Sequence, residues 1–127
     1  MAHRRAACLT AVLLAAVGPV AVACSSGTDP ANDFCTSYGD AMRGVVAAAH
    51  AGDPVAFGKI YRSTMDNMST VRAKAPDDKL RSAFDRSMFT FSVFSNDSDL
   101  AGFLVRINFS DDAVVVACGE YGVDVRV

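Results

Sequence analysis

Residues 53–76 read DPVAFGKIYRSTMDNMSTVRAKAP, and they carry the clearest structural pattern of the chain. Apolar side chains recur there every three or four residues, which is the spacing of one face of an α-helix. An aspartate followed by a proline opens the stretch, the preferred order at a helix start, and a proline closes it. The stripe consists of Phe57, Ile60, Tyr61, Thr64, Met65, Met68, Val71 and Ala75. The sequence therefore predicts a long amphipathic helix between the two prolines.

Similar stripes on either side of this stretch predict further helices. The stripe before it consists of Phe34, Tyr38, Met42, Val45 and Ala49, and the next one of Leu80, Phe84, Met88, Phe91 and Phe94. A shorter stripe consists of Leu100, Phe103, Leu104 and Ile107. Acidic residues at 111–112 can cap a last helix that ends at Gly119. Together these patterns predict an all-α domain, a small bundle of four to five helices.

The C-terminal third of the chain also permits a second fold. Apolar residues occupy every second position in 103–109 and in 123–127, and residues 114–116 are three consecutive valines. Alternation and β-branched side chains are both typical of strands. The alternative is therefore an α+β fold, with a helical hairpin followed by a small antiparallel sheet.

The first 23 residues have the three parts of a cleavable secretory signal. A positive start at 3–5 is followed by an apolar run at 6–17 and by a small-residue site at 21–23. A transmembrane helix needs about 20 predominantly apolar residues. This stretch is rich in alanine and is interrupted by Gly18-Pro19, so cleavage is favoured over an uncleaved anchor. We therefore expect residues 1–23 to be a signal peptide and the protein to be exported.

Small residues are followed at once by a cysteine in the sequence AVAC at 21–24. This order resembles a bacterial lipobox, whose cysteine receives a diacylglyceryl group and becomes the new N-terminus. The resemblance implies lipidation of Cys24 and anchoring on the outer face of the cell membrane. An ordinary signal-peptidase cut at the same bond is the alternative, and it would release a soluble secreted protein. Residues 24–31 are then a flexible tether, and residues 32–127 are a single domain.

The number of cysteines bears on the choice between lipidation of Cys24 and an ordinary signal-peptidase cut. Cys8 leaves with the signal peptide, so three cysteines remain, an odd number for an oxidising compartment. Lipidation of Cys24 would leave Cys35 and Cys118 as one pair. In an exported protein this pair either forms a disulfide or stays as two buried thiols, and the compartment favours the disulfide.

The charge of the mature chain argues against nucleic acid as a partner. The whole chain has a formal net charge of −2 at pH 7, and the leader contains Arg4 and Arg5 but no acidic residue. Cleavage therefore makes the remainder more acidic. Nucleic acid and anionic lipid headgroups both attract clustered Lys and Arg. We expect a monomer that meets the membrane through its lipid and binds a protein or envelope partner.

Candidate catalytic and metal-binding residues have simpler interpretations. His50, the one histidine after the leader, lies at a predicted helix C-terminus, where the helix dipole favours it. The acid pairs at 77–78 and 111–112 open predicted helices and are interpreted as caps. Residues 97–108 resemble a calcium loop only in part, because Ala101 and Asn108 replace two needed oxygen ligands. The sequence therefore predicts no enzyme, no catalytic residue, no metal and no cofactor.

The methionines and phenylalanines of the predicted helices suggest a second function. Methionine adapts to irregular apolar shapes, and helical bundles can hold ligands between their helices. A carrier or sensor of a small hydrophobic ligand is therefore the alternative to an interaction module, with ligand-binding residues that the sequence does not identify.

Four short motifs, in a fixed order, resemble a set of small actinobacterial (mycobacterial-type) lipoproteins of uncharacterised function. The motifs are Phe34-Cys35, Asp53-Pro54, Ala75-Pro76-Asp77 and Cys118-Gly119. The resemblance implies a helical domain closed by a Cys35–Cys118 disulfide, and it supplies no active site. Together with the predicted anchor, it favours an exported, lipid-anchored cell-envelope protein that acts as a non-catalytic interaction module.

Overall fold

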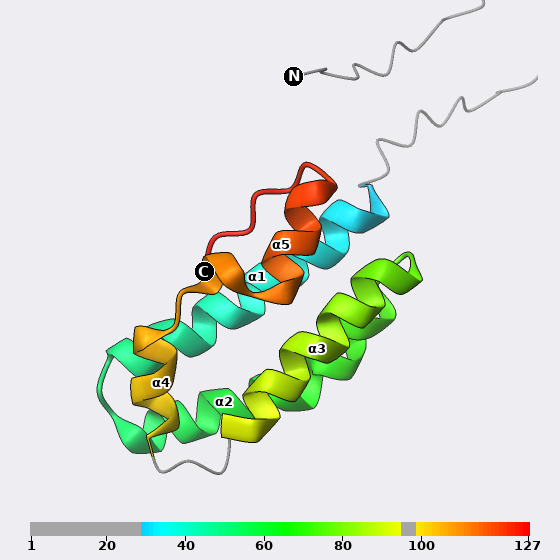
Figure 1. Ribbon diagram of the computed structural model, residues 1–127. Coiled ribbons are helices and arrows are strands. Elements are labelled where there is room, and N and C mark those ends of the chain that lie inside the picture. Colours follow the sequence, from blue (N-terminus) through cyan, green and yellow to red (C-terminus); the bar gives the residue numbers. More distant parts are fainter. Residues whose placement is uncertain (1–28, 95–98) are drawn as a thin grey trace, which may run out of the picture.

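The computed structural model of the protein describes residues 29–94 and 99–127. Figure 1 shows that these residues fold into helices. The helices are α1 (Pro30–His50), α2 (Pro54–Ala73), α3 (Asp78–Phe94), α4 (Leu100–Arg106), the 3₁₀-helix η1 (Phe109–Asp111) and α5 (Ala113–Glu120). No β-strand occurs in the two described ranges. The predicted all-α bundle is confirmed, and the alternative with a C-terminal sheet is wrong.

Aspartate side chains fix the starts of three helices, and those at 53 and 112 are among the predicted caps. Asp29 accepts a hydrogen bond from the N–H of residue 31 at 3.0 Å, and Asp53 accepts from the N–H groups of residues 55 and 56 at 2.9 and 3.0 Å. Asp112 caps α5 in the same way. These oxygens satisfy N–H groups that no carbonyl within the helix can reach. Gly52, with φ of 75°, allows the tight turn between α1 and α2.

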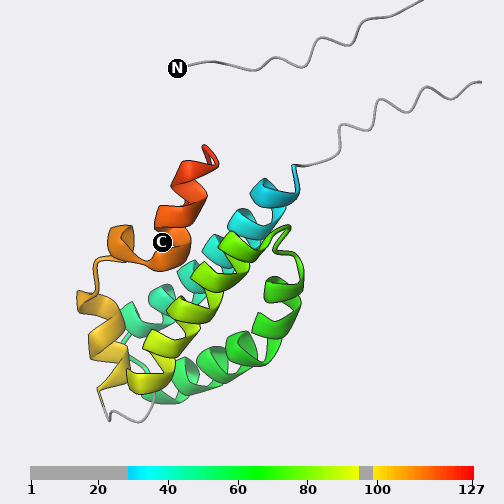
Figure 2. The same ribbon diagram turned by 45° about the vertical axis from the view of Figure 1, so that its right-hand side comes forward.

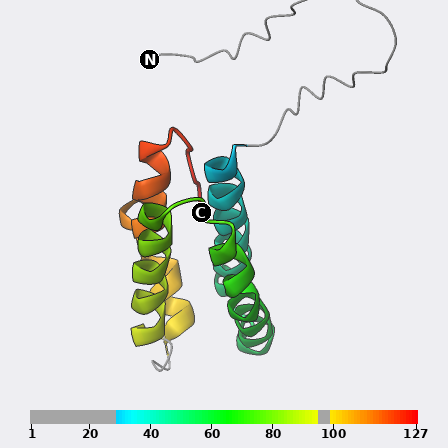
Figure 3. The same ribbon diagram turned by 90° about the vertical axis from the view of Figure 1, so that its right-hand side faces the viewer.

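The helices form two layers. Figure 3 shows the hairpin of α1 and α2 on one side and α3, α4 and α5 on the other. Helix α1 begins at the end of the bundle where α5 ends and where α2 turns into α3 (Figure 1). The turn between α1 and α2 lies at the opposite end, together with α4 (Figure 2).

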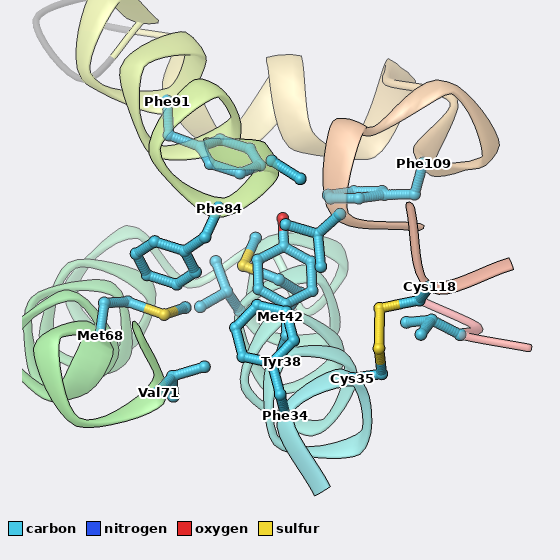
Figure 4. Close-up of a cluster of buried hydrophobic side chains, with 14 of the residues drawn as sticks. Phe34, Cys35, Tyr38, Met42, Met68, Val71, Phe84, Phe91, Phe109 and Cys118 are labelled. Atoms are coloured by element: carbon cyan, nitrogen blue, oxygen red, sulfur yellow. A yellow bond between two sulfur atoms is a disulfide. The ribbon is translucent and has the colours of Figure 1, made fainter. Parts of the chain in front are cut away.

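Aromatic side chains fill the space between the two layers. Phe34 and Tyr38 of α1 both meet Phe84 of α3 edge to face, each with ring centroids 6.2 Å apart. Phe91 of α3 stacks on Phe109 of η1 at 6.2 Å. Figure 4 shows these rings together in the core. These large rings fill the space between the two layers, where smaller side chains would leave voids.

Helix α2 is buried less fully than its stripe predicts. Phe57, Met68 and Val71 are buried, whereas Ile60 is 41% exposed. Helix α2 forms one layer with α1 (Figure 3). Its predicted apolar face is wider than the part of the helix that packs against the rest of the domain. Ile60, one residue of the predicted stripe, therefore lies outside the core.

Two boundaries differ slightly from the sequence prediction. Helix α1 begins at Pro30 and buries Ala31, so the helix includes the last two residues of the predicted tether at 24–31. Helix α5 continues through the predicted stop at Gly119 and ends at Glu120. The turn with a positive φ follows at Gly122, at 77°.

Residues 123–127, which we name the C-terminal segment, lie along α1 and form no strand. Val125 is buried against Gly39 so closely that a Cβ atom on the glycine would lie 2.9 Å from Val125 Cγ1. The guanidinium of Arg43 donates a hydrogen bond to the carbonyl of Arg126 at 2.6 Å. The alternating valines of this segment therefore reflect one buried contact with a helix, and not pairing in a sheet.

Candidate functional site

Cys35 and Cys118 form the disulfide that the resemblance implies. Cys35 lies near the start of α1 and Cys118 near the end of α5, with Cα atoms 5.9 Å apart. Both residues are fully buried, and Figure 4 shows the bond beside the aromatic core. The bond therefore ties the first helix to the last. Cys24, the predicted lipidation site, lies outside the described residues.

The C-terminal segment lies next to this disulfide. Cys35, Gly39, Val123 and Val125 line one small hollow of about 160 Å³. The N–H of Val123 donates to the carbonyl of Cys118 at 3.0 Å, which holds the segment to the end of α5. The disulfide and this segment together close the end of the bundle where α1 begins.

Three oxygen-bearing side chains from different helices meet inside the bundle. The Tyr38 hydroxyl lies 2.6 Å from the Ser87 hydroxyl and donates to Asp112 Oδ1 at 3.0 Å. Ser87 donates to Asp112 Oδ2 at 2.5 Å. Asp112 Oδ1 also accepts from the N–H groups of Val114 and Val115, at 2.9 and 3.2 Å. The carboxylate of Asp112 thus links α1, α3 and α5, and we name these three side chains the polar triad.

The surroundings of the polar triad suit a structural role. Burial raises the pKa of Tyr38 well above its usual value near 10, and the charge of Asp112 raises this pKa further. Tyr38 is fully buried and Ser87 is 2% exposed, and both hydroxyls are hydrogen-bonded within the triad. His50 is exposed at the end of α1 and lines a different hollow from Ser87. Ser87, His50 and Asp112 therefore do not form a catalytic triad.

The acidic pair at 77–78 lies at the start of α3, as predicted. Asp77 accepts from the N–H of Leu80 at 2.9 Å and from the hydroxyl of Tyr121. These hydrogen bonds lower the pKa of the Asp77 carboxyl, the one from Leu80 most strongly. Asp78 pairs with Arg81 at 2.5 Å. Both carboxylates thus have local partners at a helix start, where negative charge is stabilising.

Residues 29–94 and 99–127 contain neither a cluster of metal ligands nor a membrane-spanning helix. No three His, Cys, Asp or Glu side chains in these ranges gather closely enough to hold a metal ion. No helix in the same ranges has the length and apolar character needed to cross a bilayer. Asp97 of the partial calcium loop and the apolar run at 6–17 both lie outside the described residues.

A groove runs along the surface between α3 and α5. Its larger part, a hollow of about 470 Å³, has an apolar floor that includes Ala83 of α3 and Ala117 of α5. A neighbouring hollow of about 300 Å³ reaches down to the polar triad. Arg86, Asp111 and Ala113 line both hollows, so the two are continuous. We name them together the α3–α5 groove.

Large apolar side chains are exposed in this groove and on the adjacent face of α3. Val116 of α5 lines it and is 52% exposed. Phe89 and Val93 of α3 are 68% and 56% exposed. Phe89 follows Arg86 by three residues and Val93 follows it by seven, so all three lie on one face of the helix. This face continues the apolar groove onto the outer surface of α3.

A second hollow of about 470 Å³ lies between α1, α4, α5 and the C-terminal segment. Its walls include the apolar side chains of Val46, Leu104 and Phe109, and its rim includes His50 and Arg126. The predicted core methionines lie elsewhere, since Met42 and Met68 are buried among the aromatic rings (Figure 4).

No protein-family model, curated protein or solved structure matches this chain.

The sequence did not single out the polar triad or Arg86. Ser87 was one serine among many, although it stands three residues after Phe84 and four before Phe91, within a predicted apolar face. A hydroxyl at a core position needs a hydrogen-bond partner, and this was the available signal. Its partners Tyr38 and Asp112 lie too far away in the sequence to be identified by spacing.

Proposed function

We propose that this chain is an exported cell-envelope protein, held on the outer face of the membrane by a lipid on Cys24, and that its helical domain is a non-catalytic interaction module. The Cys35–Cys118 disulfide carries the proposal. Structural disulfides persist in oxidising compartments and are rare in the cytosol. The secretory pattern at 1–23 supplies a route to such a compartment.

The disulfide also supports lipidation of Cys24. It uses two of the three cysteines that follow the leader, so Cys24 is left without a partner in the same chain. An exposed free thiol in an oxidising compartment reacts or pairs between molecules. A thioether to a diacylglyceryl group removes that thiol and provides the two acyl chains that stable anchoring requires.

The surface of the domain supports an interaction module. Contiguous apolar surface on a soluble domain marks sites where other molecules bind. Val116, Phe89 and Val93 are more than half exposed. Val116 lines the α3–α5 groove, whereas Phe89 and Val93 lie on the face of α3 that carries Arg86, a residue of the groove. The hydroxyls of Tyr38 and Ser87, by contrast, are buried and hydrogen-bonded to a carboxylate. Binding, and not chemistry on a substrate, is the use that this surface favours.

Intact mass spectrometry of the protein from its native membrane tests the anchor. The protein is alkylated without reductant before it is measured. The expected mass begins at Cys24, carries a diacylglyceryl group and shows no alkylation. A mass that lacks lipid and carries one alkylated thiol would refute the anchor, and an unprocessed mass that includes residues 1–23 would refute cleavage.

Cys24→Ser is the matched variant for this test. It is expected to release the protein from the membrane while the urea midpoint of the domain stays unchanged, because residue 24 precedes the first helix by six positions. Retention of Cys24→Ser in the membrane fraction would count against the lipid as the anchor.

A second candidate function is carriage of a small hydrophobic ligand. The hollow between α1, α4 and the C-terminal segment favours it, since its volume of about 470 Å³ falls in the usual range of ligand pockets. Native mass spectrometry of the folded protein should then show a bound lipid that organic solvent extracts. Val105→Trp, at the exposed side of this hollow, would obstruct it and should lower the amount of bound lipid, whereas Ile60→Trp on α2, at a position equally exposed, should leave it unchanged.

A further inference from the structure

We propose that the α3–α5 groove binds an amphipathic helix of a partner protein, and that Arg86 binds a carboxylate on that helix. The inference rests on the proposed function and deepens it, because it names the surface and the class of partner. Its basis is the juxtaposition of an open apolar groove, an exposed apolar face on α3 and one cation without a partner.

The shape of the groove suits a helix. Residues from Lys79 to Thr90 of α3 line it, and at 1.5 Å per residue they span about 17 Å, or three helical turns. Helix-in-groove recognition places apolar side chains of the ligand helix at successive turns into such a surface. The larger hollow has an apolar floor between α3 and α5 with Val116 beside it, and Phe91 and Ile107 add apolar surface in the neighbouring hollow.

The exposed side chains extend the contact beyond the groove. Phe89 and Val93 stand on the outer face of α3, 68% and 56% exposed. Aromatic and arginine side chains dominate binding energy at protein interfaces when a partner covers them. Phe89 and Arg86 lie one helical turn apart, so a single partner helix can cover both.

The charges that line the groove indicate which charge the partner helix carries there. Lys79 and Glu120 form an ion pair with each other. Asp111 accepts a hydrogen bond from the amide of Asn108 at 3.5 Å. Arg86 is exposed, and its guanidinium has no hydrogen-bond or ion-pair partner among the described residues. A guanidinium binds a carboxylate with two parallel hydrogen bonds, so a partner acid opposite Arg86 satisfies it.

The same charges disfavour a lipid surface as the occupant. Asp111 and Glu120 are exposed acids beside the groove, and they would meet anionic headgroups together with Arg86. Binding to anionic lipid requires clustered Lys and Arg. A protein helix can place its one carboxylate at Arg86 and keep polar groups opposite Asp111.

Site-specific photocrosslinking in intact cells tests this proposal. A benzophenone amino acid replaces Val116 at the groove in the full-length lipid-anchored protein, and the matched control carries it at Ile60 on α2. Both positions hold an exposed aliphatic side chain, 52% and 41% exposed. We expect a discrete adduct with another protein from position 116 and none from position 60. Mapping should place the crosslink in an amphipathic segment with an Asp or Glu.

Arg86 variants test the charge. Arg86→Glu should lower the adduct yield from position 116 about tenfold, Arg86→Lys should retain most of it, and Asp111→Asn should not lower it. Because Arg86 and Asp111 are exposed, these variants should keep the wild-type urea midpoint. Equal yields from Arg86→Glu and wild type would overturn the assigned role of Arg86.

The crosslinking pattern separates failure of this inference from failure of the proposed function. Adducts from position 60 but not from position 116 would leave an interaction module and overturn the groove as its surface. An adduct of twice the protein's mass, or lipid adducts only, would overturn a partner helix in favour of a second copy or of the membrane. No protein adduct from either position would overturn both proposals.

Discussion

Removal of the Cys35–Cys118 disulfide is expected to take away a large part of the stability of this domain. The bond joins residues that are 83 positions apart in the sequence. Loop-closure entropy gives about 4.5 kcal/mol for a loop of that length, and this value is an upper bound because residual structure in the unfolded chain reduces it. Domains of this size unfold with about 5–15 kcal/mol in total. Loss of the bond therefore leaves a marginally stable fold.

The double variant Cys35→Ala, Cys118→Ala measures this contribution. Alanine keeps both fully buried positions apolar, whereas serine would bury two hydroxyls. Urea unfolding is followed by far-UV circular dichroism. With a slope of about 1.5 kcal/mol per molar urea, the upper bound of about 4.5 kcal/mol corresponds to a fall of at most about 3 M in the midpoint. The slope itself should rise, because an unfolded chain without the crosslink exposes more surface.

Two comparisons make this result interpretable. Wild-type protein in reductant should unfold at the midpoint of the double variant, and each single Cys→Ala variant should match it as well. A drop of less than about 1 kcal/mol in the double variant would refute the reasoning, because the closed loop would then constrain the unfolded chain very little.

Three further predictions concern buried contacts. Tyr38→Phe should cost about 2 kcal/mol in urea unfolding, because it removes a buried hydroxyl that donates to Asp112, whereas Tyr61→Phe, whose hydroxyl has no hydrogen bond in the described structure, should cost far less. The pKa of Tyr38 is raised by burial, so stability should be unaffected below about pH 10, the pKa of tyrosine in the unfolded chain, and should fall as the pH rises above it. Tyrosinate absorbance at 295 nm should then show Tyr38 ionising only as the protein unfolds, and ionisation of all tyrosines in the folded state would contradict this. Gly39→Ala should displace the C-terminal segment, because its Cβ would lie 2.9 Å from Val125 Cγ1, and faster amide exchange in that segment is the expected result.

The helices were predictable because their signals are local. Each long apolar stripe corresponds to one helix, and the aspartates at 29, 53 and 112 cap the helices that follow them. The three valines at 114–116 favour a strand by propensity, yet they lie in α5. Packing of Val114 in the core and the cap at Asp112 outweigh a propensity difference of a few tenths of a kcal/mol per residue.

The groove and the polar triad were not predictable, because both depend on distant parts of the chain. Tyr38 and Asp112 are 74 positions apart, and a single sequence gives no measure of their proximity. Arg86 resembles any other exposed helical arginine until its neighbours in α5 are known. The C-terminal segment was ambiguous for a related reason, since alternating valines indicate one buried side but not whether a sheet or a helix covers it.

The disulfide also determines how this molecule transmits mechanical load. Cys35 follows the start of α1 by only five residues, and Cys118 precedes the last residue by only nine. Tension applied between the two chain ends passes directly from Cys35 to Cys118 through the S–S bond. The segment between the two cysteines covers 83 positions, a contour of about 290 Å, and it cannot be extended while that bond is intact. Helices α2, α3 and α4 therefore bear none of the applied tension. Helix α3, one wall of the α3–α5 groove, lies outside the part of the chain that bears it.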